Sequence, residues 1–221
     1  MLAAVSDSTN TTPEALESLY RLANVYFQEK DLTNAEKYLL EVNRRTLNKD
    51  AGYLTDLIVY YLETNQVSKA DAKYKSAMQS LGKEQAAVLT SYMGEYYVNK
   101  NDLVKAQSYF SEAIKDSTSK GSAATAFRLG QIAIANGNKA EAEKYFIMMN
   151  EKTEWKDEEA LKVLGIFYLD TQNYDKAEET LKKGMVLNPK NLEVRVILLE
   201  LYETKNDQNS VTSIISEIKA I

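Results

Sequence analysis

The side chains that most often carry out chemistry are scarce in this sequence of 221 residues, which contains no Cys and no His. Their absence excludes thiolate nucleophiles, disulfides, zinc sites built on Cys or His, and Ser-His-Asp or Cys-His catalysis. Carboxylate pairs such as Asp157-Glu158-Glu159 could in principle do acid–base work. This group stands where a helix is predicted to begin, and acids at that position stabilise the helix dipole. We therefore predict a protein that is not an enzyme, with no catalytic residue, no metal site and no cofactor.

Charge and glycine spacing exclude further classes of function. The glycines are isolated, and none forms the phosphate-binding patterns G-x-x-x-x-G-K-[ST] or G-x-G-x-x-G. The net charge of -5 argues against a chain whose main partner is nucleic acid. The longest dense apolar run, residues 57–62, is far shorter than the 18 or more residues of a membrane-spanning helix. With only 2 Pro and 8 Gly, the composition favours helices joined by short loops.

The elements that organise these residues come from an internal repeat with steps of 34 to 36 residues. Its fixed position is held by Ala35, Ala70, Ala106, Ala142, Ala177 and Val211. Twelve residues earlier most units carry a small residue, namely Ala23, Gly94, Gly130 or Gly165, whereas Ile58 and Leu199 break the rule. A tyrosine follows the small position by three residues in five units, and a large apolar or aromatic residue follows the alanine by four in every unit.

Offsets of three and four keep side chains on one face of a helix, so each unit is predicted to be two amphipathic helices. The helices break at polar pairs that end one helix and cap the next. These pairs are Lys30-Asp31, Asn65-Gln66, Asn101-Asp102, Gly137-Asn138, Gln172-Asn173 and Asn206-Asp207. The small residue and the alanine allow the two backbones to approach closely, and neighbouring hairpins must stack to cover their apolar faces.

The pattern resembles the tetratricopeptide repeat, most closely in Leu161-x2-Leu164-Gly165-x2-Tyr168…Ala177-x3-Leu181…Pro189. The sequence departs from the family pattern by lacking its Trp and, in five units, its closing Pro. The resemblance implies an all-α, right-handed superhelical solenoid of antiparallel helix hairpins. We predict one solenoid domain over residues 14–221, after a flexible segment at 1–13. Its six units begin near Leu16, Ala51, Ala87, Ala123, Glu158 and Leu192.

The resemblance also implies that positions 2, 5, 6, 9, 12 and 13 of each first helix line a concave groove that holds a peptide. The predicted groove residues are Tyr20, Asn24, Phe27, Asp56, Val59, Tyr92, Glu95, Phe127, Arg128, Gln131, Lys162 and Ile166. Over all six units these positions hold nine acids and three bases, so the predicted groove carries a formal charge of -6. A basic and apolar protein segment would suit this surface.

The predicted function is a protein–protein interaction scaffold, and two alternatives stay open. One is a recruiting or regulatory module of a larger enzyme or of a secretion or assembly machine, and the other is a self-associating structural subunit. The last helix presents a docking face for another subunit or domain, formed by Val211, Ile214, Ile215 and Ile218.

The compartment is left open between cytoplasm and periplasm. The Ser/Thr/Asn run at residues 6–12 resembles a linker, so a signal or lipid anchor removed upstream of it is one hypothesis. The His-free composition, rich in Tyr, Asn and Lys, favours a bacterial source.

Overall fold

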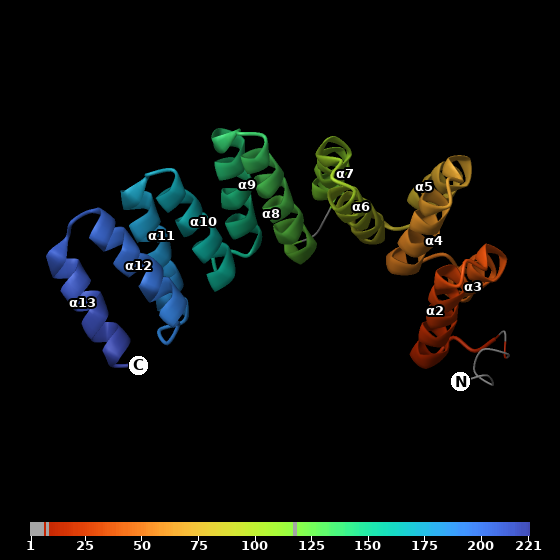
Figure 1. The fold of residues 1–221 in the computed structure, drawn as a ribbon, viewed down its shortest axis with the longest axis horizontal. Coiled ribbons are helices and arrows are strands. Elements are labelled where there is room, and N and C mark those ends of the chain that lie inside the picture. Colours follow the sequence, from red (N-terminus) through yellow and green to blue (C-terminus); the bar gives the residue numbers. More distant parts are fainter. Residues whose placement is uncertain (1–6, 8, 117–118) are drawn as a thin grey trace. The chain divides into compact units, whose positions relative to one another are not determined.

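The computed structural model describes residues 7, 9–116 and 119–221, which form twelve α-helices and no strand (Figure 1). They fall into two compact units, Met1–Ser117 and Thr118–Ile221. The first unit holds α2 (Pro13–Gln28), α3 (Leu32–Arg45), α4 (Ala51–Glu63), α5 (Val67–Ser80), α6 (Lys83–Asn99) and α7 (Leu103–Asp116). The second holds α8 (Ser119–Ala135), α9 (Lys139–Lys152), α10 (Glu158–Asp170), α11 (Tyr174–Leu187), α12 (Leu192–Thr204) and α13 (Gln208–Lys219).

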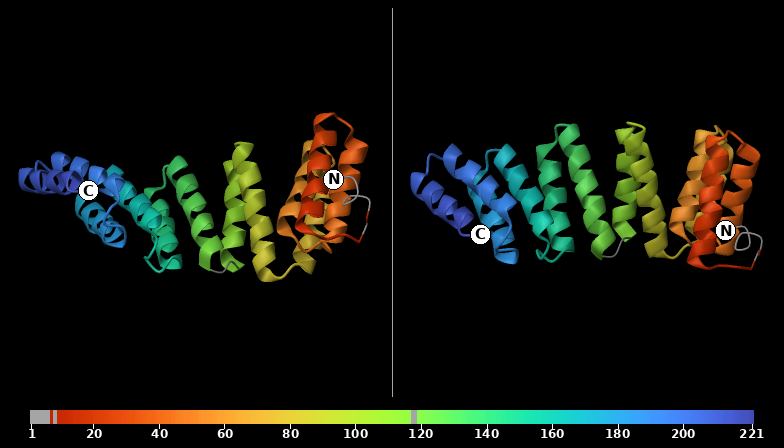
Figure 2. Two further views of the ribbon diagram at one scale, coloured as in Figure 1. Left: turned by 90° about the horizontal axis from the view of Figure 1, so that it is seen from below. Right: turned by 60° about the horizontal axis from the view of Figure 1, so that its bottom comes forward.

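Consecutive helices pair into hairpins, and Figure 2 shows the two helices of each pair side by side. The all-α hairpin architecture predicted from the repeat is therefore confirmed. The prediction of one domain over residues 14–221 stays a prediction, beside the division into two compact units. Residues 1–6 and 8 of the predicted flexible segment lie outside the described residues. Within the described part, Arg45 donates a hydrogen bond from Nη1 to the main-chain oxygen of Asn10, at 2.8 Å.

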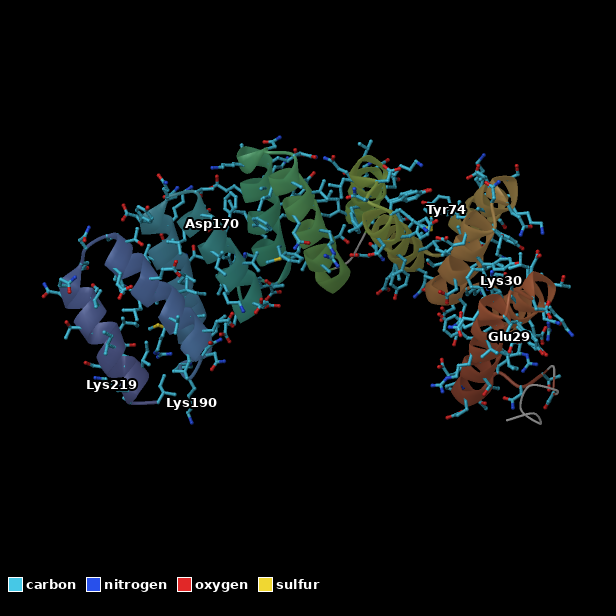
Figure 3. The ribbon with its side chains drawn as sticks, in the orientation of Figure 1. Glu29, Lys30, Tyr74, Asp170, Lys190 and Lys219 are labelled. Atoms are coloured by element: carbon cyan, nitrogen blue, oxygen red, sulfur yellow. The ribbon has the colours of Figure 1, made fainter. Side chains whose placement is uncertain are left out.

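All six hairpin turns share one conformation, and they lie at the predicted polar pairs. The first residue of each pair has a positive φ, between 56° and 75°, as in Lys30, which Figure 3 labels at the first turn. The second residue donates its N–H to a carbonyl oxygen five residues back, as Asp31 does to Tyr26 at 2.9 Å. Four of the six second residues also cap the next helix with a side-chain oxygen: Asp31, Asp102, Asn138 and Asp207. One left-handed residue followed by a cap is enough to reverse the chain.

Close packing within a hairpin depends on the predicted small residue. A Cβ atom added to Gly94 would lie 2.6 Å from the ring of Phe110, and one added to Gly130 would lie 2.5 Å from the ring of Phe146. At Gly165 the distance to Leu181 would be 2.6 Å. These distances are shorter than any ordinary carbon–carbon contact, so only glycine lets the large residue of the second helix reach the first helix at these three places.

The second hairpin shows what happens when the small residue is missing. Ile58 occupies the small position of α4, and Tyr74 of α5 stands where Phe110 or Phe146 stands in other hairpins. Tyr74, labelled in Figure 3, contacts the next hairpin: its hydroxyl lies 3.3 Å from Thr90 Oγ1, and its ring lies 5.7 Å from Tyr109. Ile58 and Tyr74 thus take the places of the small residue and the phenylalanine in this hairpin.

The two units are built on a duplicated pattern in which residue n of the first corresponds to residue n + 107 of the second. The bounds of α3, α4 and α5 recur with this shift in α9, α10 and α11. The sequence Ala35–Tyr38 recurs unchanged at Ala142–Tyr145. From residue 13 to residue 80, 19 of 68 positions are identical to their counterparts. Residues that correspond in the two units can therefore be compared directly, and a change of residue type at such a pair can be related to a change in the surrounding packing.

A buried asparagine joins neighbouring hairpins at the same place in both units. Asn43 Nδ2 donates to the main-chain oxygens of Leu39 and Tyr53, at 2.9 and 2.8 Å. Asn150 Nδ2 donates to those of Phe146 and Ala160, at 2.9 and 3.0 Å. The backbones at Tyr53 and Ala160 are therefore held in equivalent positions by equivalent bonds.

A second shared contact joins a glutamate, a tyrosine and a lysine across neighbouring hairpins. Glu143 Oε1 accepts hydrogen bonds from the Tyr168 hydroxyl at 3.0 Å and from Lys176 Nζ at 2.8 Å. The counterparts Glu36, Tyr61 and Lys69 form the same bonds, also at 3.0 and 2.8 Å. Burial, and then the bond to Glu143, raises the pKa of Tyr168 to about 12, so its hydroxyl keeps its proton at neutral pH. The repeat's tyrosine is thus used to bind the preceding hairpin.

Replacing Tyr168 with phenylalanine is expected to lower the free energy of unfolding by about 1 kcal/mol, because the bond to Glu143 is lost while the ring stays. Tyr61→Phe is expected to cost a similar amount in the first unit. The exposed Tyr92→Phe is the control and is expected to change stability by less than about 0.5 kcal/mol. Urea unfolding measures all three, and a Tyr168→Phe protein as stable as the native chain would contradict this account.

Candidate functional site

The second unit contains a cleft of about 760 Å³ between α8, the end of α9 and the start of α10. Predicted groove residue Phe127 lines it, together with Ala124, Glu159 and Val163, which also occupy groove positions of their first helices. The rest of the lining comes from Ala123, Met149, Lys152, Thr153, Glu154, Lys156, Asp157 and Ala160. Clefts of this size commonly hold a ligand or a segment of a partner.

Most charged residues of the cleft are already engaged within the unit. Lys156 pairs with Glu154 at 2.6 Å, and Glu159 pairs with Lys162 at 2.7 Å. Asp157 caps α10 by accepting a hydrogen bond from the Ala160 N–H at 3.1 Å. This confirms that the acidic group 157–159 begins a helix. The walls that remain for a ligand are mainly Phe127, Met149 and Val163.

The twelve predicted groove residues are all exposed or half-buried, so none belongs to the buried core. Seven lie in the first unit, on α2, α4 and α6, and five lie in the second, on α8 and α10. Phe127 alone lines the cleft. The role of this set in binding stays a prediction.

Several of the predicted residues pack against neighbouring rings. The rings of Tyr20 and Tyr53 lie 5.9 Å apart, and those of Phe27 and Tyr60 lie 5.8 Å apart. Phe127 lies 6.4 Å from the buried Phe146. Tyr92 has 47% of its surface exposed. Phe27 and Tyr92 are therefore the rings of this set that are most accessible for a further stacking contact.

The carboxyl group of Asp56 lies half-buried on α4. Burial, and then the charge of Asp50, raises the pKa of Asp56 from 3.8 to about 6. Desolvation disfavours the ionised form, so this carboxyl titrates closer to neutral pH than an exposed aspartate does. The acid expected to attract a basic partner therefore also carries an energetic cost to the fold.

Ion pairs occupy other charges of the predicted surface. Lys162 Nζ bridges Glu159 at 2.7 Å and Glu193 at 2.9 Å, which ties α10 to α12, and these bonds raise the pKa of Lys162. Glu63 pairs at 2.6 Å with Lys100, which lies outside the predicted groove. Arg128 donates to Gln131 at 3.0 Å. Because Lys100 is not one of the predicted groove residues, its pairing with Glu63 offsets one of the negative charges counted in the formal charge of -6.

The predicted docking face on α13 is corrected in part. Val211 and Ile214 are 9% and 3% exposed and belong to the core of the second unit, so they are not available to a partner. They are buried in a cluster that includes Leu198, Leu201 and Tyr202 of α12, the first helix of the same hairpin. Ile215 and Ile218 are half-buried, and their use in docking stays a prediction.

The residues that shape the cleft and that sequence reasoning missed are Met149 and Ala160, with Tyr53 as the counterpart of Ala160 in the first unit. The match between Ala35–Tyr38 and Ala142–Tyr145 is the signal that could have found them. It sets the shift of 107 and exposes the change from Tyr53 to Ala160.

Over residues 7, 9–116 and 119–221, the chain has no helix that is long and apolar enough to cross a membrane. No group of three or more acidic side chains in that part of the chain is placed to hold a metal ion.

Comparison with known proteins agrees with the hairpin architecture. Models of the tetratricopeptide repeat match residues 16–46 and 159–191 and, separately, residues 93–147. No curated protein matches the sequence.

Solved structures of similar fold cover nearly the whole chain. The C-terminal part of a TPR repeat-containing protein from Cytophaga hutchinsonii has a TM-score of 0.63 at 16% identity, over 99% of this chain and 94% of that one. BtubC from P. vanneervenii has 0.61 at 14% identity, over 93% and 88%. Pseudomonas aeruginosa pilF has 0.57 at 16% identity, over 94% and 91%.

The family matches cover more than half of the 221 residues, and they fall on hairpins whose turns and small-to-large packing follow the repeat. The chain belongs to the tetratricopeptide repeat family.

Proposed function

We propose that this protein is a non-catalytic scaffold that binds a segment of a partner protein on the first helices of its hairpins. Tetratricopeptide repeat proteins mediate protein–protein interactions, and the family generally serves as a scaffold without catalysis. The cleft of the second unit is the observation that carries the proposal, because four of its lining residues occupy first-helix positions that face a ligand in the family.

The nature of the surface supports a protein segment over a small charged ligand. The walls of the cleft combine an aromatic ring, a methionine and a valine, while most of its charged groups are satisfied by neighbours. Exposed Tyr92 and Phe27 offer aromatic contacts on the first helices of the other unit. Large side chains with mixed apolar and polar character are typical of residues that dominate protein interfaces.

Site-specific photo-crosslinking tests this proposal. A benzoylphenylalanine placed at Ala124, which is exposed and lines the cleft, is expected to cross-link one partner of defined mass in the native cell. The control places the same group at Val186, which is 78% exposed on α11, a second helix. Cross-linking at Val186 but not at Ala124 would contradict the proposed surface.

A further inference from the structure

At the place in the first unit that corresponds to the cleft of the second unit, the chain has the side chain of Tyr53. The backbones of Tyr53 and Ala160 are equivalent, since each carbonyl accepts a hydrogen bond from the corresponding buried asparagine, at 2.8 and 3.0 Å. Tyr53 lays its ring against Tyr20, the counterpart of Phe127, with the centroids 5.9 Å apart and the planes inclined at 57°. Ala160 has only a methyl group at this place, and the cleft is open there.

The residues around the Tyr53 hydroxyl also correspond to residues that line the cleft of the second unit. Burial raises the pKa of Tyr53, and the nearby groups that contribute are Asp50, Glu17, Asp56 and Tyr20. Their counterparts after the shift of 107 are Asp157, Ala124, Val163 and Phe127. All four of these counterparts line the cleft. The open space of the second unit therefore corresponds to the site that a tyrosine side chain fills in the first.

We propose that this cleft binds a tyrosine side chain presented by a segment of the partner protein. This inference rests on the proposed function and names the chemistry that its site recognises. The guest ring takes the place of Tyr53, against Phe127 and between Met149 and Val163. Ring–ring and sulfur–ring contacts favour an aromatic guest over an aliphatic one of similar size.

The cleft of the second unit has fewer carboxylates than the corresponding place in the first unit, which suits the binding of a side chain from a partner. Around Tyr53 the acids Glu17 and Asp56 accompany the ring, whereas Ala124 and Val163 replace them in the cleft and remove two carboxylates. Lys152 lines the cleft as well, so its ammonium is a cationic group that a guest segment meets there. The tyrosine that stands beside Tyr20 in the first unit is the reason for proposing tyrosine and not phenylalanine as the guest.

The first test uses N-acetyl-tyrosinamide as the probe and follows the methyl signals of Met149 and Val163 by NMR. We expect saturable shifts at these methyl groups, and binding at least about threefold weaker for N-acetyl-leucinamide, from the usual size of aromatic contacts. Equal binding of the leucine probe, or shifts spread over the surface without saturation, would overturn the proposal.

Two exchanges between the units make the test specific. Ala160→Tyr supplies the ring that the first unit already has, and it should weaken the probe at least about tenfold, a loss of about 1.4 kcal/mol. Tyr53→Ala should open the corresponding cleft and create a second site for the probe in the first unit. Circular dichroism checks that each variant is folded. If Ala160→Tyr does not fold, Ala160→Val replaces it in the binding test, because valine narrows the cleft without adding a ring. Undiminished probe binding in the folded cleft-filled variant would overturn the proposal.

Failure of this inference is distinguishable from failure of the proposed function. A partner that cross-links at Ala124 but binds the Ala160→Tyr chain unchanged would overturn the tyrosine site and leave the scaffold function in place. Cross-linking at Val186 alone would overturn the scaffold surface, whatever the result with N-acetyl-tyrosinamide.

Discussion

Gly130→Ala is expected to lower the free energy of unfolding of the second unit by about 1–3 kcal/mol, the usual cost of overpacking a core. The added Cβ would lie 2.5 Å from the ring of Phe146, which is 2% exposed and has little room to move. Phe167 limits that movement further, since its ring lies 5.3 Å from that of Phe146. The substitution also favours helix formation by up to about 1 kcal/mol, so the steric cost must exceed this gain.

Gly184→Ala is the matched control, because it lies inside α11 of the same unit and its new Cβ would meet Leu161 at an ordinary 3.7 Å. It should raise stability by about 0.5–1 kcal/mol through helix propensity alone. Adding Phe146→Leu to Gly130→Ala reproduces Ala23 and Leu39, the pair in the first hairpin, and should recover part of the loss. Chemical unfolding measures each change, and a Gly130→Ala chain that gains stability as Gly184→Ala does would contradict the close approach.

Asp56→Asn is expected to stabilise the first unit at pH 7 by about 1–3 kcal/mol, from the difference in pKa between the folded and unfolded chain. The carboxyl titrates near 3.8 when unfolded and, because of burial, near 6 when folded. Between these values the unfolded chain has already lost the proton that the folded chain keeps. Native stability therefore falls as the pH rises from about 4 to 6 and is not recovered above it.

The asparagine variant lacks this titration, so its advantage should be absent at pH 4 and complete by pH 7. Asp31→Asn gives the opposite sign as a control: hydrogen bonds from Asn34 lower the pKa of Asp31, so its ionised form stabilises the fold, and that contribution is lost as the pH falls. Urea unfolding at a series of pH values measures both. An Asp56→Asn advantage that is equal at pH 4 and pH 7 would contradict the burial of an ionised carboxylate.

The features that the sequence could predict are those determined within one hairpin. Lys30-Asp31 and its five equivalents each combine a residue that accepts a positive φ with, in most cases, a capping side chain, so local chemistry sets the turns. Gly130 and Phe146 hold the repeat's small and large positions on the two helices of one hairpin, so their contact also follows from the repeat.

Features that depend on a neighbouring element could not be predicted in the same way. Val211 and Ile214 have the spacing of an exposed face, yet they belong to a buried cluster that includes Leu198 and Leu201 of α12. The cleft depends on one side chain that is missing at Ala160, and an alanine at a helix start gives no periodic signal. The small size of Ala160 becomes informative only when it is compared with Tyr53, which stands at the corresponding position 107 residues earlier.

The central claim is that the cleft of the second unit holds the partner. The most direct test measures how tightly the partner that cross-links at Ala124 binds the native chain and the Ala160→Tyr chain. Titration calorimetry with purified partner supplies both values. The account predicts a loss of at least about tenfold, equivalent to about 1.4 kcal/mol, when the chain's own ring fills the cleft. Equal affinity for the two folded proteins would contradict the claim that this cleft holds the partner.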